Sequence, residues 1–169
     1  MITELKLTPL EAFQHLRRVL ERVNAVASTL LLSEIRFNEE TASPFGEGKQ
    51  ETSQEDEDNN PLIQIWSFEP EKGNVIFCSA FDCWGFSINR FAFYWAKKLS
   101  INKGILQKHL FDDYGYNPTT KKIIKVDPYN PQIKPMFVTM ILEPIWQMYD
   151  VIFNQQNSEK AAKMAKRAV

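Results

Sequence analysis

One stretch, from Gly73 to Phe86, constrains the fold more than any other part of this sequence. Its apolar run Val75-Ile76-Phe77 is followed by a short turn and then by the pattern of an amphipathic helix. A short continuous apolar run is typical of a strand covered on both faces, and we therefore expect a buried strand over 74–79. In open α/β sheets, ligands bind just beyond the carboxyl ends of the strands. Ser79 and Ala80 occupy that place, with side chains small enough for a flat ligand to approach the backbone.

The sequence also resembles a known family in four blocks that occur in the same order. The run that ends in Ser79-Ala80-Phe81 resembles the guanine-contact loop of the elongation factor 2 family of translational GTPases. The other blocks are Glu4 to Phe13, which resembles the segment after the family's Asn-Lys-x-Asp motif; Trp84-Gly85-Phe86 with Phe91-Ala92; and Lys134 to Val138 with Ile141 to Trp146, which resemble the family's last helix. The resemblance covers most of the chain outside 33–61. It is strongest to the elongation factor 2-like GTPases of ribosome assembly.

This resemblance implies an α/β fold, the C-terminal half of a P-loop-type GTPase domain with an inserted subdomain. It divides the chain into residues 1–100 of the GTPase domain, an inserted lobe over 101–134, and the last helix of the domain with a tail over 135–169. In the family, the residues that correspond to Ser79, Ala80 and Phe81 contact the guanine base of GTP. The family usually carries Gly where this chain has Cys83, and Gly tolerates a positive φ that Cys does not.

Three motifs of the family are absent from this sequence. It contains no Gly-x-x-x-x-Gly-Lys-Ser/Thr loop to cradle phosphates, no Asp-x-x-Gly switch and no Asn-Lys-x-Asp. In the family, all three lie upstream of the part that begins here at Met1. We therefore expect an internal fragment that lacks the ligands of Mg²⁺ and does not hydrolyse GTP alone. The complete parent would be a GTPase with GTP and Mg²⁺ as its cofactors.

The function implied by the resemblance is cytoplasmic maturation of the large ribosomal subunit. Such a GTPase works with a maturation partner protein to release the factor that keeps the subunits apart. The long acidic insertion and the sequence Leu142-Glu143-Pro144-Ile145-Trp146 favour this over a second interpretation, a fragment of translational elongation factor 2 itself. A third interpretation, from a different class, is a free-standing protein that binds a ribosomal or GTPase partner and has no catalytic activity.

Charge and hydropathy limit the partners of this chain. The formal net charge of -1 argues against a general nucleic-acid binder, and hence against a DNA partner. No run of eighteen apolar residues occurs, so no membrane span is expected. A loose basic series with interleaved tyrosines could contact rRNA or an acidic ribosomal protein, or could be an ordinary charged surface. Its members are Lys97, Lys98, Lys103, Lys108, Lys121, Lys122 and Lys125, with Tyr114, Tyr116 and Tyr129.

Local patterns predict the remaining elements. Thr8-Pro9-Leu10-Glu11 is a helix start with a capping box, and apolar residues at three- and four-residue steps extend the helix over 8–32. Residues 33–61 read as a disordered acidic insertion, either solvated or touching a partner. We expect a short strand over 62–70, helices over 87–99, 102–111 and 135–153, and a hairpin pairing 114–116 with 122–126. Pro144 should bend the helix that contains it.

Several residues have side chains of the kinds found in catalytic or metal sites, but a structural role explains each of them more simply. Cys78 and Cys83 do not have zinc-ligand spacing, and we expect two small buried hydrophobic side chains in a reducing compartment. His15 should lie on the surface of the first helix. Asp112 and Asp113 could form a metal or acid/base pair, but no third ligand lies near them in the sequence, which favours a polar turn.

Overall fold

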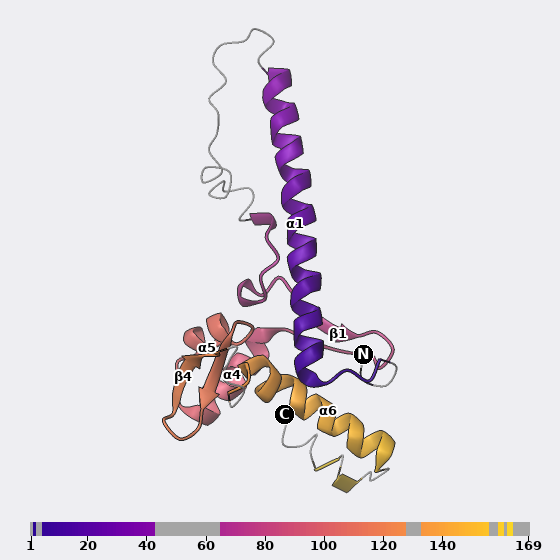
Figure 1. Cartoon of the computed structure of the whole chain (residues 1–169), viewed down its shortest axis with the longest axis vertical. Coiled ribbons are helices and arrows are strands. Elements are labelled where there is room, and N and C mark those ends of the chain that lie inside the picture. The colour runs from indigo at the N-terminus through magenta and orange to yellow at the C-terminus, as the bar shows by residue number, and fades with distance from the viewer. Residues whose placement is uncertain are drawn as a thin grey trace. The chain divides into compact units, whose positions relative to one another are not determined.

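The computed structural model describes residues 2, 5–42, 65–127, 133–155, 159–160 and 162–163, and it combines helices with two small sheets (Figure 1). This mixture is consistent with the predicted α/β class. Both sheets within the described residues are two-stranded and antiparallel. The chain divides into two compact units, one formed by Met1–Leu16 with Pro70–Val169 and the other by Arg17–Glu69.

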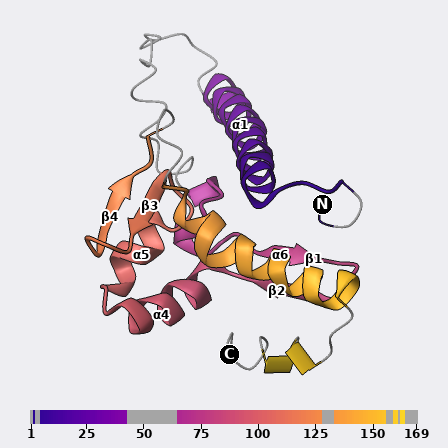
Figure 2. The ribbon, with the colours of Figure 1, turned by 60° about the horizontal axis from the view of Figure 1, so that its bottom comes forward.

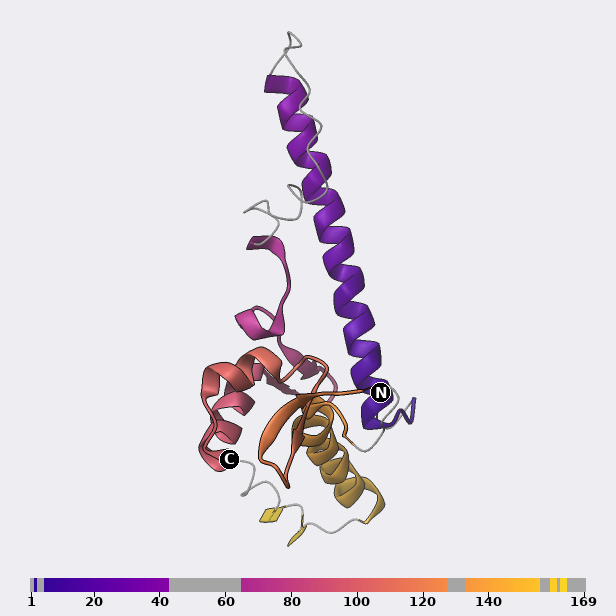
Figure 3. The same ribbon diagram turned by 60° about the vertical axis from the view of Figure 1, so that its left-hand side comes forward.

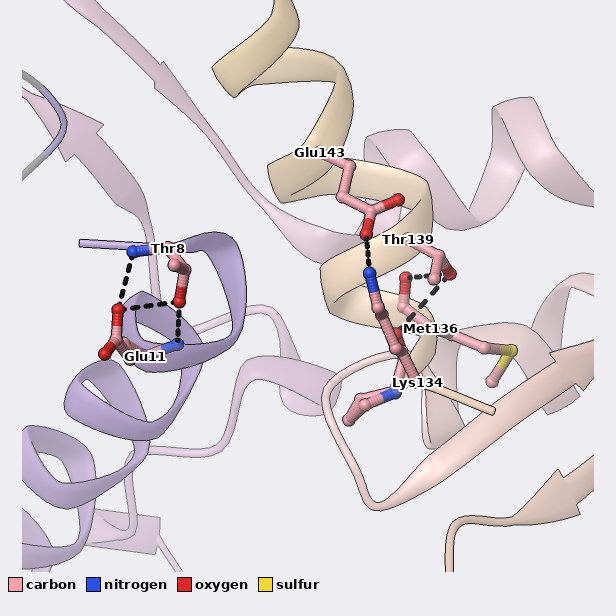
Figure 4. A network of polar contacts seen from close by, with 7 residues as sticks. Thr8, Glu11, Lys134, Met136, Thr139 and Glu143 are labelled. Carbon is pink, nitrogen blue, oxygen red and sulfur yellow. Dashed lines mark hydrogen bonds and ion pairs between the residues drawn. The ribbon is translucent and has the colours of Figure 1, made fainter. Parts of the chain in front are cut away.

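The first helix, α1 (Pro9–Ala42), begins at the predicted capping box (Figure 4). The Thr8 backbone N–H and hydroxyl both donate to Glu11 Oε2, at 2.8 and 2.7 Å, and the Glu11 N–H donates to Thr8 Oγ1 at 3.3 Å. Pro9 occupies the first helical position, where its missing N–H costs nothing. These reciprocal bonds satisfy backbone donors that have no partner inside the helix.

The end of α1 differs from the prediction. The helix continues to Ala42, ten residues beyond the expected end at Leu32. The start of the predicted insertion is therefore helical, and the physical reason is visible in the sequence, because no Gly or Pro interrupts the chain before Pro44. The rest of that insertion, residues 43–61, lies outside the described residues.

In the second unit, Arg17–Glu69, one side chain of α1 bonds to the segment that ends the unit. Asn24 Nδ2 donates to the Phe68 carbonyl at 3.0 Å, and the Phe68 N–H donates to Asn24 Oδ1 at 2.8 Å. The expected strand over 62–70 is wrong for its described part, since Ile65 and Trp66 form a helical turn and an irregular segment follows. Several apolar side chains of this unit are exposed, namely Val19, Val23, Val26, Leu30, Phe37, Ile65 and Trp66.

The first unit contains a tight hairpin in place of the expected buried strand. Strand β1 (Phe77–Ser79) pairs with β2 (Trp84–Phe86) in an antiparallel register that places Phe77 opposite Phe86 and Ser79 opposite Trp84. The rings of Phe77 and Phe86 stack with centroids 5.6 Å apart. A 3₁₀ turn, η1 (Pro70–Lys72), precedes the hairpin.

Helices α4 (Ile88–Leu99) and α5 (Lys103–His109) pack against each other, as Figures 1 and 3 show in salmon. Asn102 caps α5 by accepting from the Gly104 N–H at 2.7 Å. The predicted second hairpin is confirmed as β3 (Tyr114–Asn117) paired with β4 (Lys122–Lys125). The helices predicted over 87–99 and 102–111 are confirmed as α4 and α5.

The last helical segment is continuous from Met136 to Asn154 but irregular in its winding. Wide π-turns, η2 (Val138–Leu142) and η3 (Asp150–Asn154), flank the α-helical part α6 (Glu143–Tyr149). Pro144 lies in the first turn of α6, directly after the π-turn η2, and the bend at Pro144 stays a prediction. Glu159, Lys160, Ala162 and Lys163 are also helical.

The core of the first unit is assembled from the start of α1, from α4, from the C-terminal part of α5 and from the segment 136–142. Its fully buried large side chains are Phe13, Ile88, Leu106, Leu110, Met136, Phe137, Val138 and Ile141. Within the described part of the chain, no helix is both long enough and apolar enough to cross a membrane.

Candidate functional site

The predicted guanine-contact residues lie at the turn of the β1–β2 hairpin. Ser79 ends β1 and is half-buried, whereas Ala80 is exposed and Phe81 is 94% exposed at the tip. Figure 2 shows this hairpin running beside α6, and hydrogen bonds from the turn reach that helix. The structure therefore brings the three residues together on an accessible surface.

The strand that leads to this turn is not the one that the sequence predicted. Exposure alternates along it, with Phe77 and Ser79 half-buried and Ile76 and Cys78 exposed, so it is not covered on both faces. Its partner β2 runs antiparallel, and among the described residues no parallel sheet places Ser79 at a carboxyl rim. A continuous apolar run fits an edge hairpin as well as a buried strand, because periodicity alone does not identify the pairing partner.

The turn is shaped by a hydrogen-bond network centred on Asp82. Ser79 Oγ donates to Asp82 Oδ2 at 2.7 Å, and the Asp82 N–H donates back to Ser79 Oγ at 3.3 Å. The hydroxyl of Tyr149, on α6, also donates to Asp82 Oδ2. Trp84 Nε1 donates to the same Tyr149 oxygen at 2.8 Å. The network thus ties both strands of the hairpin to one side chain of the helix beside it.

The pKa values of Asp82 and Tyr149 are shifted in opposite directions within this network. Hydrogen bonds from Tyr149 and then Ser79 lower the pKa of Asp82 below its ordinary value. Burial, followed by the neighbouring Asp82 carboxylate, raises the pKa of Tyr149. At neutral pH the network therefore pairs an ionised carboxylate, which only accepts, with a neutral phenol, which donates to it.

Cys83 completes the turn in a conformation that favours glycine. Its φ is 56°, in the left-handed region where a Cβ atom crowds the backbone. Glycine, which the resemblance led us to expect here, would adopt this φ without strain, whereas Cys83 adopts it with a side chain. The prediction that both cysteines are buried is wrong, since Cys78 and Cys83 are both free and exposed.

The side chains of this turn offer a small residue beside an exposed aromatic ring, a combination suited to a flat ligand. Ala80 offers little bulk, and the exposed ring of Phe81 offers an apolar surface on which a base could stack. The Ser79 hydroxyl already donates to Asp82, so it keeps only acceptor capacity for a ligand. The sequence contains no Gly-x-x-x-x-Gly-Lys-Ser/Thr loop that would bind the phosphates of a nucleotide. Among the residues that the structure describes, no three His, Cys, Asp or Glu side chains are placed to hold a metal ion.

The other residues singled out from the sequence lie away from this turn. His15 is exposed on α1, as predicted. Asp112 and Asp113 lie in the turn after α5, where the Asp113 N–H donates to Asp112 Oδ1 at 2.8 Å. The described lysines of the basic series are all exposed, and Lys98 Nζ lies 4.5 Å from the centroid of the Trp95 ring.

Sequence reasoning missed the residues that hold the turn. Asp82 has a detectable signal, because an Asp three residues after a Ser is a common way to close a turn with side-chain hydrogen bonds. Tyr149 has none, since it lies 67 residues away from Asp82 and is one of several aromatic residues with helical spacing. A shallow groove lined by Pro9, Trp146 and Asp150, among others, does not include the hairpin turn.

Comparison with known proteins gives one consistent family. No protein-family profile matches the chain. Elongation factor-like GTPase 1 is 42% identical in Mus musculus over 97% of this chain and 39% identical in Homo sapiens over 94%. Ribosome assembly protein 1 of Saccharomyces cerevisiae is 37% identical over 98%. The chain spans only 15% of the length of each of these relatives. By this similarity, the chain belongs to the family of elongation factor 2-like GTPases.

Proposed function

We propose that this chain is part of a GTPase that acts in cytoplasmic maturation of the large ribosomal subunit, where it releases the factor that keeps the subunits apart. The similarity to ribosome assembly protein 1 over nearly the whole chain supports this proposal. Because the chain spans about 15% of such relatives, GTP hydrolysis, Mg²⁺ binding and ribosome contacts are proposed for the complete protein. Within it, residues 101–134 would form the lobe inserted in the C-terminal half of a P-loop-type GTPase domain.

We further propose that Ser79, Ala80 and Phe81 contact the guanine base. The observation that carries this proposal is the placement of the three residues at an accessible turn whose backbone is held by side chains on both sides. An ordered turn presents its backbone groups to a ligand without first losing conformational entropy. Phe81 would cover one face of the base, and Ala80 would leave room for its edge.

The base contact can be tested in the complete protein by equilibrium titration with GDP. Ser79→Trp fills the space beside the turn and should abolish measurable binding. The matched control is Thr120→Trp, which places the same bulk at the exposed turn of the β3–β4 hairpin and should leave the affinity unchanged. Unchanged GDP affinity in Ser79→Trp would show that the base lies elsewhere.

We also propose that the basic series contacts rRNA in the complete protein. Lys121 and Lys122 are exposed at the turn end of the β3–β4 hairpin, and Lys125 is exposed at its open end, opposite Tyr114. Replacing all three with Gln should weaken binding to rRNA of the large subunit and lower the salt dependence of the affinity, because each lost phosphate contact reduces the slope by about one. An unchanged slope would indicate an ordinary charged surface.

A further inference from the structure

The hydroxyl group of Tyr149 contacts the hairpin on both sides of its most strained residue. It donates to Asp82, immediately before Cys83, and accepts from Trp84 Nε1, immediately after Cys83, at 2.8 Å. Cys83 itself has the positive φ of 56°. A single atom on α6 therefore fixes the two neighbours of the one turn residue whose backbone is unfavourable for its side chain.

Such a conformation persists only where the surroundings determine it. A non-glycine residue in the left-handed region tends to relax to negative φ unless its neighbours are held. The Asp82 carboxylate also receives the Ser79 hydroxyl at 2.7 Å, so the same network extends to the first residue of the candidate base site. Loss of the Tyr149 hydroxyl would release Cys83 and, through Asp82, the backbone that carries Ala80 and Phe81.

We propose that Asp82 and Tyr149 are positioning residues, which hold the turn in the conformation that accepts guanine and make nucleotide affinity depend on α6. This inference rests on the proposed base contact at Ser79–Phe81. Neither residue needs to touch the base, because each acts through the hydrogen bonds of the turn. The strain at Cys83 is what makes their support necessary.

The ionisation of the pair supports this role. Asp82 is held in its charged form by its two hydroxyl donors, and a charged acceptor strengthens each of those bonds. Tyr149 remains a neutral donor, because burial and the adjacent carboxylate both oppose its ionisation. The bonds from Ser79 and Tyr149 to Asp82, and from Trp84 to Tyr149, therefore keep the same direction throughout the neutral pH range.

The test is a GDP titration of the complete protein at 25 °C and neutral pH, with the thermal unfolding midpoint measured for every variant. GDP binding by the unaltered protein tests the proposed function, and the comparison among variants tests this inference. Tyr149→Phe should raise the Kd for GDP by about tenfold, the effect expected when a hydrogen bond to a charged group is lost. Asp82→Asn, which keeps one acceptor oxygen, should raise it less than Asp82→Ala.

Two further variants separate positioning from general stability. Trp146→Phe removes a different hydrogen bond of α6, the 2.7 Å bond from Trp146 Nε1 to the Leu7 carbonyl. It should lower the unfolding midpoint without changing the Kd. Adding Cys83→Gly to Tyr149→Phe should recover most of the lost affinity, because glycine adopts the required φ without support. Equal Kd values for Tyr149→Phe and the unaltered protein would overturn the inference, as would an affinity loss that Cys83→Gly does not recover.

Discussion

The indole nitrogen of Trp95 donates to the backbone carbonyl of Met140 at 3.1 Å. In a regular α-helix that carbonyl would accept from the residue four positions later, which here is Pro144 and has no N–H to give. Met140 is almost fully buried. The side chain from α4 thus supplies a donor to a carbonyl whose regular α-helical donor is missing.

This relationship predicts a measurable coupling between Trp95 and Pro144. Trp95→Phe should destabilise the chain by about 2 kcal/mol, because it leaves a buried acceptor without its donor. In a Pro144→Ala background the restored N–H can bond to the same carbonyl, so the cost of Trp95→Phe should be smaller. Urea unfolding of the four proteins gives the coupling energy. Additive effects of the two substitutions would contradict this account.

The capping box predicts the effect of Thr8→Ala. Loss of the Thr8 hydroxyl removes its bonds with Glu11, and the free energy of unfolding should fall by about 1 kcal/mol. Thr29→Ala is the control on the same helix, since the Thr29 hydroxyl only bonds back to the Ala25 carbonyl at 2.8 Å. That change should have little effect on denaturant unfolding, because this bond competes with regular helix geometry.

Acid should weaken the start of α1 through Glu11. Hydrogen bonds from the Thr8 side chain and backbone lower the pKa of Glu11 in the folded chain. Its stabilising contribution is therefore complete above the unfolded-state pKa, about 4 for a carboxyl group, and is lost as pH falls through the lower folded value. Denaturant midpoints at pH 7, 4 and 3 should fall less steeply in Glu11→Gln than in the unaltered chain. Parallel pH curves for the two proteins would reject this assignment.

Gly115 should not accept a larger residue. A Cβ atom there would lie 2.2 Å from Ile133 Cγ2 and 2.7 Å from the Lys134 carbonyl oxygen. Gly115→Ala must therefore displace the backbone, and we expect a loss of roughly 1–3 kcal/mol in unfolding free energy. Gly104→Ala, in α5, meets only the Asn102 side-chain oxygen at 3.2 Å and should change stability by less than about 1 kcal/mol. Equal thermal midpoints for the two variants would show that the backbone around Gly115 moves at little cost to make room for the added methyl group.

The features that could be predicted from the sequence depend on residues close together in it. The start of α1 follows from Thr8 and Glu11 three residues apart, and the cap of α5 follows from Asn102 next to its first turn. The β3–β4 hairpin follows from a turn sequence between two short apolar segments. In each case, neighbouring residues satisfy the backbone, so distant parts of the chain do not alter the outcome.

The features that could not be predicted depend on distant partners or on helix winding. No local sequence pattern shows that β1 pairs antiparallel with β2, or that the Tyr149 hydroxyl bonds to Asp82. Regular helical spacing would place Ile152 on the same side as Ile145 and Met148, but Ile152 is 47% exposed, whereas the adjacent Val151 is 3% exposed. The π-turn η3 includes both residues, so the spacing of the side chains there departs from the regular α-helical repeat.

That departure also determines how probes can be attached to the end of this helix. Gln155 contacts Asp150 through both its backbone N–H, at 3.1 Å from the Asp150 carbonyl, and its side-chain amide, at 2.7 Å from Asp150 Oδ2. Asn154 also donates to Asp150 Oδ1 at 2.7 Å, so two spin labels or a chemical cross-linker can share one side of the helix here at a separation of five positions as well as four. Labels at positions 150 and 155 would then report a shorter separation than regular α-helical geometry predicts.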